Sequence, residues 1–212
     1  IIYLIGILYF NNNSNCWTLR QYFANDLKDE TQLLIEAVDF LSSFDTIVNY
    51  NGNSFDIPFL NYRLKLFDID MALSKDKSLD LYAILRKNRD FISLKNLKLT
   101  RFLGIHREDI YSGKDCIQFY KDYILKGDLD LKERVLKHNY DDLYYLLQVL
   151  KILDILEENK TIRFKKDGLD LSFIIRDMYL EKDFFTVSME IAGNLNYNIY
   201  FYGNNYKLFI ND

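Results

Sequence analysis

Hydrophobic and polar residues follow two different periods along this chain, and the change falls near residue 158. Before that point, short apolar runs precede stretches in which apolar residues recur every three or four positions, as in strands followed by amphipathic helices. After it, apolar and polar residues alternate one by one over several short segments, which is typical of antiparallel strands. The pattern predicts an α/β domain over residues 1–158 and a small antiparallel β-meander over residues 159–212.

The predicted α/β domain opens with a hairpin. Residues 1–10 form a continuous apolar run, the polar stretch over 11–15 is a turn, and residues 16–23 are the returning strand. Thr31 is a suitable N-cap for the next helix, whose buried face is formed by four apolar residues, Leu34, Ala37, Val38 and Leu41. A short β-branched strand over residues 46–49 follows.

The stretch after this strand carries the first candidate for chemistry. Residues 51–53, Asn-Gly-Asn, favour a turn because both residue types tolerate positive φ. Apolar residues recur at helical spacing from Ile57, and Pro58 fits only the first turn of that helix. Asp56 therefore marks the end of a strand and the start of a helix, where ligands bind in α/β sheets. It is a candidate ligand-binding residue or, alternatively, a helix N-cap.

A second candidate lies downstream, on a predicted apolar helix that continues to Leu156. His138 and Asp142 are four residues apart, so their side chains share one face of this helix. Asp141 is about 100° further around and is expected to point away. Asp142 is expected to be largely buried, which requires a bound divalent cation or an arginine partner. Asp56 and Asp142 together form half of a plausible two-metal site.

These two segments resemble the motifs of a known family. Residues 50–60, YNGNSFDIPFL, are similar to the second exonuclease motif of the DnaQ-like (DEDD) nucleases within the ribonuclease H-like superfamily. Residues 138–142, HNYDD, resemble their third motif in the form of the YprB-type branch, and SLDLYAILRK (78–87) and SLKNLKLTRFLGIHRED (93–109) are also similar to that branch. The resemblance covers residues 1–156 and implies a ribonuclease H-like mixed sheet flanked by helices.

One motif of the family is missing from residues 1–212. The first motif, an Asp-x-Glu on the first strand, is expected upstream of Ile1, so the resemblance places two of the four metal-binding carboxylates outside this sequence. Either the natural protein starts earlier or the chain has lost half of the site. We favour the first hypothesis, because loss of a central strand would leave buried backbone groups unpaired.

The resemblance also implies roles for single residues. Asp56 and Asp142 bind two Mg²⁺ or Mn²⁺ ions together with the Asp-x-Glu carboxylates, and His138 orients the attacking water or acts as general base. Asn51 and Asn139 are candidates for positioning the water or the substrate. Asp80 resembles an Asp that recurs after the second motif, and we interpret it as a helix cap or a structural hydrogen-bond acceptor, with a metal role as the alternative. Phe55 is expected to pack beneath the site, with stacking on a base as the alternative.

Basic residues crowd the segment that follows. Arg86 and Lys87 begin a series of cations in an otherwise acidic chain; the others are Arg89, Lys95, Lys98, Arg101 and Arg107. We interpret them as a rim for the sugar-phosphate backbone, with a solvated helix surface as the alternative. His106 lies among them without a partner at a recognisable spacing and is expected to be structural.

The predicted function is a metal-dependent nuclease, a 3′–5′ exonuclease on single-stranded DNA or RNA that uses a two-metal mechanism. The alternative is a nucleic-acid-binding or scaffold domain without the first-motif carboxylates. Residues 1–212 alone are expected to hydrolyse poorly, because two carboxylates hold two dications weakly. Aromatic residues of the β-meander are expected to be ordinary sheet residues, with stacking on unpaired bases as the alternative.

Composition limits these interpretations only slightly. A formal net charge of −4 over 212 residues argues against a generic polyanion binder, but local basic patches and bound cations also attract phosphate. Cys16 and Cys116 do not form a disulfide or metal framework, so we expect both to be reduced and buried in a cytoplasmic protein. The sequence contains no uncharged apolar run of about 18 residues, so we expect no membrane span.

Overall fold

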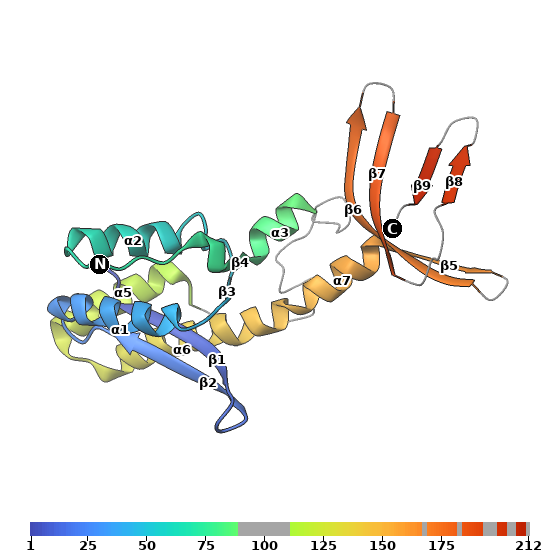
Figure 1. Cartoon of the computed structure of the whole chain (residues 1–212). Helices are drawn as coiled ribbons and strands as arrows, with labels where there is room; N and C mark the ends of the chain where they lie inside the picture. Colours follow the sequence, from blue (N-terminus) through green and yellow to red (C-terminus); the bar gives the residue numbers. More distant parts are fainter. Residues whose placement is uncertain (89–110, 167–168, 182–183, 193–198, 203–206, 211–212) are drawn as a thin grey trace. The chain divides into compact units, whose positions relative to one another are not determined.

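The computed structural model describes residues 1–88, 111–166, 169–181, 184–192, 199–202 and 207–210 (Figure 1). The chain divides into two compact units, Ile1–Ile152 and Leu153–Asp212. This division falls within α7 (Lys151–Lys160), so a domain boundary at residue 158 stays a prediction.

The first unit mixes short strands with longer helices (Figure 1). Its elements in chain order are β1 (Leu4–Asn11), β2 (Cys16–Phe23), the 3₁₀ turn η1 (Leu27–Asp29), α1 (Glu30–Ser42), β3 (Ile47–Asn49), α2 (Asp56–Leu66), the 3₁₀ turn η2 (Lys75–Lys77), β4 (Ser78–Asp80), α3 (Leu81–Lys87), α5 (Gly113–Lys126) and α6 (Leu129–Val149). The mixed α/β class predicted from the sequence is confirmed.

The strands of this unit form two small sheets. β1 and β2 pair as an antiparallel hairpin with Leu4 opposite Phe23, and β3 pairs in parallel with β4. Among the described residues no backbone ladder joins the hairpin to the β3–β4 pair. The predicted hairpin and the predicted short strand are therefore present as two separate sheets.

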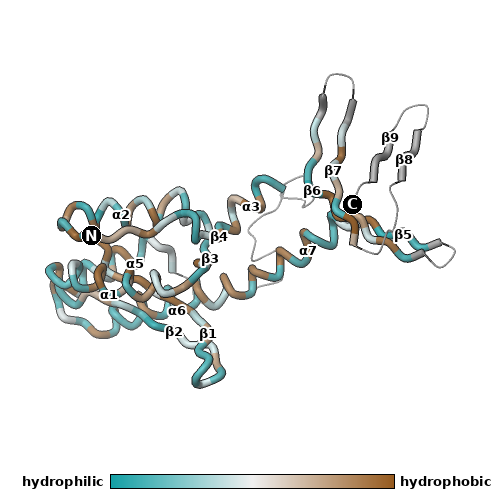
Figure 2. The backbone as a smooth tube through the Cα atoms, in the orientation of Figure 1, coloured by the Kyte–Doolittle hydropathy of each residue, from teal (hydrophilic) through white to brown (hydrophobic). Residues whose placement is uncertain are grey.

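One hydrophobic core lies against both sheets. Ile7 of β1 packs with Leu34 and Val38 of α1 and with Leu64 of α2, while Ile47 of β3 packs against the same cluster. Figure 2 shows hydrophobic residues along the whole length of α2. Since both sheets contribute to one core, the helices α1 and α2 hold them in a single folded unit.

The start of α1 differs from the sequence-based prediction. The helix begins at Glu30, before Thr31, so the prediction of Thr31 as N-cap is wrong. The reason lies in η1, where the side chains of Asp26 and Asp29 and their backbone N–H groups form a reciprocal capping box. The predicted buried face of the helix is confirmed: Leu34, Ala37, Val38 and Leu41 are all buried.

A buried ion pair joins α1 to α2. Glu30 is 2% exposed and accepts from Arg63 Nε at 2.7 Å and from Arg63 Nη2 at 2.5 Å. The backbone N–H of Ile2 donates to the same carboxylate at 2.7 Å. Because both charges are paired and hydrogen-bonded, the pair fixes α2 against α1 without an unsatisfied charge.

The other face of the hairpin packs on α6. A Cβ atom on Gly6 of β1 would overlap Asn139 Oδ1 and the Leu143 side chain of α6. Glycine therefore lets the helix approach the strand closely. The preceding α5 ends at Gly127, whose φ of +68° confirms the predicted glycine stop.

The second unit is antiparallel, as predicted. In chain order β5 (Thr161–Lys166), β6 (Leu169–Glu181) and β7 (Phe184–Ala192) form one three-stranded sheet, while β8 (Ile199–Tyr202) pairs with β9 (Lys207–Ile210). A register shift between Ile175 and Asp177 marks a bulge in β6. The predicted hairpin turn at 203–205 lies outside the described residues.

The two cysteines occupy different environments. Cys116 is buried, but Cys16 is exposed at the hairpin, so the prediction that both are buried is wrong. Hydrogen bonds from Ser14 and Thr18 lower the pKa of the Cys16 thiol. Among the described residues, no helix is long and apolar enough to cross a lipid bilayer.

Candidate metal and nucleic-acid site

Asp56, the first candidate carboxylate, follows an irregular turn between β3 and α2. Asn51 has a φ of +66°, a conformation that asparagine adopts more readily than most residues. Gly52 donates its N–H to Asn49 Oδ1 at 2.9 Å, and a Cβ on Gly52 would lie 2.6 Å from that oxygen. The predicted turn is confirmed, and the close approach of the Asn49 side chain explains its glycine.

The buried carboxylate of Asp80, which lies outside the turn at the end of β4, forms hydrogen bonds with its backbone. Asp80, 4% exposed, accepts from the backbone N–H of Asn51 at 2.8 Å and of Asn53 at 3.1 Å. It also caps α3 by accepting from the N–H groups of Tyr82 and Ala83, which confirms the predicted helix cap. Asp80 thus bonds two segments that are distant in sequence.

Asp56 is the first residue of α2. The N-cap position belongs to Phe55, and no side chain caps this helix terminus, so the alternative of an Asp56 N-cap is not observed. Desolvation by neighbouring residues raises the pKa of Asp56, its own backbone N–H opposes the rise, and the nearby Asp80 carboxylate adds to it. The Asp56 side chain is exposed and positioned at a helix N-terminus, where an anion is favoured.

The second candidate group lies on α6. His138 Nε2 is 3.5 Å from Asp142 Oδ2, as their spacing predicts. The Asp142 side chain is 47% exposed, however, so the prediction of a largely buried Asp142 is wrong. The buried acid is Asp141, at 2% exposure, whose Oδ1 accepts from Lys137 Nζ at 2.6 Å.

The rotation of α6 explains this exchange. Asp141 and Tyr145 are both buried and lie one turn apart, so the buried side of this half of the helix passes through residue 141. Asp141 Oδ2 has no hydrogen-bond partner in the described structure. The expectation that Asp141 points away from the interior is therefore also wrong.

The two asparagines proposed from the resemblance have structural contacts. Asn139 Oδ1 accepts from Gln21 Nε2 at 2.9 Å, and Gln21 also donates to the Leu136 carbonyl at 2.9 Å. This contact fixes α6 to the hairpin. Asn51 is half-buried and its N–H is bonded to Asp80, so its observed role is to shape the turn.

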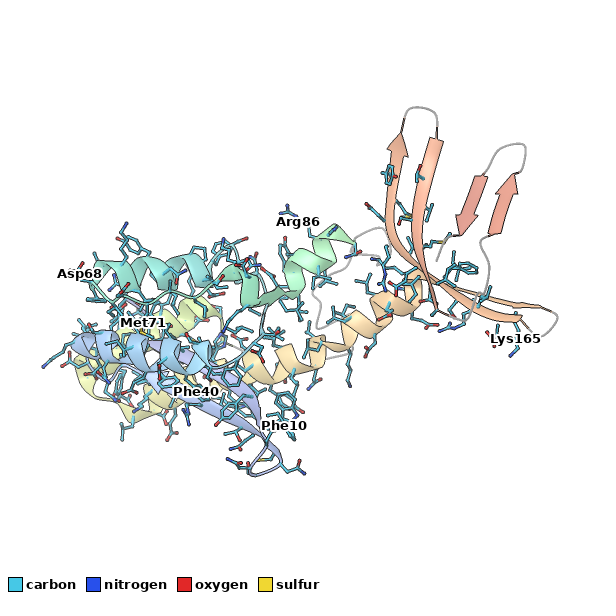
Figure 3. All side chains as sticks on the ribbon, viewed as in Figure 1. Phe10, Phe40, Asp68, Met71, Arg86 and Lys165 are labelled. Atoms are coloured by element: carbon cyan, nitrogen blue, oxygen red, sulfur yellow. The ribbon has the colours of Figure 1, made fainter. Side chains whose placement is uncertain are left out.

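The basic residues are only partly described. Arg86 and Lys87 are exposed in the last turn of α3, and Figure 3 labels Arg86. The other residues of the predicted rim, together with His106, lie outside the described residues. The described part of the rim thus consists of two exposed cations at one helix end, a suitable but small contact for phosphate.

Sequence reasoning missed an aromatic surface around Asp56. Phe55 is 67% exposed, so the prediction that it packs beneath the site is wrong. Phe59 and Tyr62 are also exposed, with ring centroids 6.4 Å apart. The signal was the spacing of residues 55, 59 and 62, which places them opposite the buried face of α2.

The described carboxylates do not by themselves assemble a metal cluster. Within the described ranges, no group of three or more His, Cys, Asp or Glu residues is arranged to hold a metal ion. Asp56 and the His138–Asp142 pair are two separate positions at a strand-to-helix turn and on α6. Any metal site built from them requires further ligands.

Parallel strands joined through a helix, a neighbouring antiparallel hairpin and packed helices define a mixed α/β protein of the ribonuclease H-like class. A family model of the RNase H superfamily matches residues 1–154, and the chain belongs to this superfamily. The finer assignment to the DnaQ-like, YprB-type branch stays a prediction.

One segment of the chain also matches a curated protein. A segment of 50 residues is 40% identical to a DNA polymerase of Methanocaldococcus jannaschii. The segment is 24% of this chain and 3% of that polymerase. No solved structure matches the chain.

Proposed function

We propose that this protein is a metal-dependent nuclease, a 3′–5′ exonuclease that hydrolyses the phosphodiester bonds of single-stranded DNA or RNA. Membership of the RNase H superfamily supports a nuclease-type function with a nucleic acid as substrate. The observation that carries the proposal is the placement of Asp56, an exposed carboxylate at the start of α2 that does not cap its helix. A structural cap would have used this side chain on the helix N–H groups.

The available donors suit hard divalent cations. Asp56 and Asp142 would hold Mg²⁺ or Mn²⁺ through carboxylate oxygens. Such ions, when bound, activate water and stabilise negative charge on phosphate and on the leaving oxygen. His138 Nε2 lies 3.5 Å from Asp142 Oδ2, so its imidazole is beside one of these carboxylates, where it would orient the attacking water or accept a proton from it.

The remaining carboxylates require a further strand. Ala24 N–H donates to the Tyr3 carbonyl at 2.9 Å, so the alternating pairs of the hairpin direct the backbone groups of Leu4, Gly6 and Leu8 toward the edge of β1 away from β2. In the described structure no strand pairs with that edge. We propose that a strand carrying Asp-x-Glu fits between β1 and β3 and completes both sheet and site.

A second candidate function is a non-catalytic nucleic-acid-binding or scaffold domain. The specific observation in its favour is that the described residues contain no group of three metal-ligating side chains. The two candidate functions differ in catalysis. A nuclease cleaves its substrate and needs the carboxylates of Asp56 and Asp142 to do so, whereas a binding or scaffold domain does not cleave.

The deciding experiment measures cleavage of a 5′-labelled single-stranded oligonucleotide by the full-length gene product in Mg²⁺, Mn²⁺ or EDTA. We expect metal-dependent shortening from the 3′ end, and a loss of about 100-fold or more in D56N and D142N. D68N is the matched control, because Asp68 lies just beyond the other end of α2 and its φ of +53° suits asparagine (Figure 3). Binding of the oligonucleotide without metal-dependent cleavage would support the second candidate.

The same assay tests the missing carboxylates. Residues 1–212 alone are expected to cleave far more slowly than the full-length product, because Asp56 and Asp142 cannot hold two dications well. Robust cleavage by residues 1–212 in Mn²⁺ would show that no further strand is needed. The nuclease proposal would then stand with a different ligand set.

A further inference from the structure

Asp80 makes more hydrogen bonds than a helix cap requires. Its Oδ1 accepts from the N–H groups of Tyr82 at 3.0 Å and Ala83 at 3.2 Å, which satisfies the start of α3. The same oxygen accepts from Asn51 at 2.8 Å, and Oδ2 accepts from Asn53 at 3.1 Å. Capping explains the first two bonds and leaves the two bonds to the turn unexplained.

The turn that Asp80 holds leads directly to Asp56. Only Ser54 and Phe55 separate Asn53 from Asp56, and the N–H of Ile57 donates to the Gly52 carbonyl at 3.0 Å. The first turn of α2 is therefore hydrogen-bonded to the segment that Asp80 fixes. A change in this segment changes the direction in which the Asp56 carboxylate leaves the helix.

The turn has few other supports. Its remaining described backbone and side-chain bonds are local: Ser54 N–H to the Asn51 carbonyl at 3.2 Å, and Gly52 N–H to Asn49 Oδ1 at 2.9 Å. Asn51 also adopts the left-handed conformation, which most residues avoid. Asp80 supplies the direct long-range hydrogen bonds to the turn, whereas Asn49 supports it indirectly by donating to Ser78 Oγ at 2.6 Å.

We propose that Asp80 is a positioning residue for Asp56, bonding the turn over residues 51–53 to the start of α3 so that the catalytic carboxylate is held in one place. The inference rests on the proposed nuclease function. It also explains why an acid is required here, since only a carboxylate offers two acceptor oxygens to four N–H donors. Misplacement of a catalytic group by about 1 Å can cost about 100-fold in rate.

Two substitutions separate positioning from capping. Asp80→Ser keeps a good N-cap for α3, but its short side chain cannot reach the turn. Asp80→Asn keeps one acceptor oxygen and turns an NH₂ group toward the N–H of either α3 or the turn. Asp128→Asn is the matched control, because Asp128 caps α6 through the N–H of Asp130 alone among the described residues.

The test measures kcat and KM of the full-length protein on a single-stranded oligonucleotide at saturating Mg²⁺, together with hydrogen exchange of the turn amides. We expect D80S and D80N to lower kcat by about 10- to 100-fold with KM changed less than about twofold. The amides of Asn51 and Asn53 should exchange faster in D80S while those of α3 stay protected. D128N should leave kcat and both sets of amides unchanged.

The outcomes distinguish this inference from the function on which it rests. If D56N loses activity while D80S and D80N keep the wild-type kcat, the positioning role is refuted and the nuclease proposal stands. If the wild-type protein shows no metal-dependent cleavage, the nuclease proposal fails, whereas cleavage that persists in D56N would refute the assignment of Asp56 to the catalytic site. Unchanged exchange at Asn51 and Asn53 in D80S would refute the role of Asp80 without reference to activity.

Discussion

The turn that presents Asp56 and the helix that presents Asp142 are built in different ways. The turn has irregular backbone conformations, a left-handed Asn51 and hydrogen bonds to Asp80, which lies 24 residues beyond Asp56 in the sequence. On α6 the contact between His138 and Asp142 is explained by helical spacing alone, because residues four apart share one face of a helix. A carboxylate on an irregular turn depends on distant partners, whereas a carboxylate on a long helix depends on the rotation of that helix.

This difference locates the weak points of each region. The turn is sensitive to its own anchors and to the placement of α2, which Glu30 and Arg63 fix from α1. The α6 region is sensitive to the close packing of Gly6 against Asn139 and Leu143. Substitutions directed at one region should therefore leave the other intact.

The largest effect on stability is expected from breaking the Glu30–Arg63 ion pair between α1 and α2. Glu30→Ala leaves the largely buried Arg63 guanidinium and the Ile2 N–H without their acceptor, so the free energy of unfolding should fall by about 3–5 kcal/mol. Urea denaturation followed by circular dichroism measures this loss. The matched control is Glu36→Ala, an exposed residue of the same helix, with an expected change within about 0.5 kcal/mol.

A double substitution sharpens this prediction. Glu30→Leu combined with Arg63→Met replaces both charges with apolar groups, and should recover most of the stability that E30A loses. If the double variant is no more stable than E30A, the loss arises from packing and not from the unpaired guanidinium. The pair would then be a poor explanation of how α2 is held.

The sequence predicted the structural features that depend on local residue pattern. Pro58 in the first turn of α2, Gly127 at the end of α5 and the strand over Cys16–Phe23 follow from residue type and spacing. The N-cap role of Asp80 was predicted for the same reason, because an acid before a helix is a local signal.

The sequence did not predict what depends on tertiary packing. Adjacent acids on α6 exchange places between interior and surface if the helix rotates by 100°, and the spacing of His138 and Asp142 does not determine that rotation. Phe55 is exposed because the buried face of α2 passes through Ile57, Leu60 and Leu64, which lie opposite to it. The bonds from Asp80 to Asn51 and Asn53 join distant segments, and no local pattern encodes them.

Two glycines provide an intermediate test of the comparison, one in each region. Gly52→Ala would place a Cβ 2.6 Å from Asn49 Oδ1, a side chain held by its bond to Ser78 Oγ, and should disturb the turn. Gly6→Ala would overlap Asn139 Oδ1 and should displace α6 from the hairpin. Each is expected to lower the free energy of unfolding by about 1–3 kcal/mol.

Hydrogen exchange shows whether the two regions are separate. G52A should speed exchange of the turn amides and G6A that of the α6 amides, each without the other. Gly113→Ala is the control, because nothing lies within 4 Å of its added Cβ at the start of α5, and its stability should change by less than about 0.5 kcal/mol. Parallel changes in both regions after either substitution would contradict the separation.

The smallest effect concerns the charge of Asp56. Desolvation by neighbouring residues raises its pKa above the ordinary value of 3.8, so the folded protein binds this proton more tightly than the unfolded chain does. Above the folded-state pKa the ionised carboxylate opposes folding; as pH falls through the folded-state pKa toward 3.8 both states become protonated and the cost disappears.

Asp56→Asn removes the cost at neutral pH. The variant should therefore be slightly more stable than the wild type at pH 7, by less than about 0.5 kcal/mol because solvent screens an exposed group. Thermal unfolding without divalent metal, compared between pH 7 and pH 3, measures the difference, which should vanish at the lower pH. A D56N protein that is less stable than the wild type at pH 7 would mean that the carboxylate stabilises the turn, which would favour a structural acid over one reserved for a ligand.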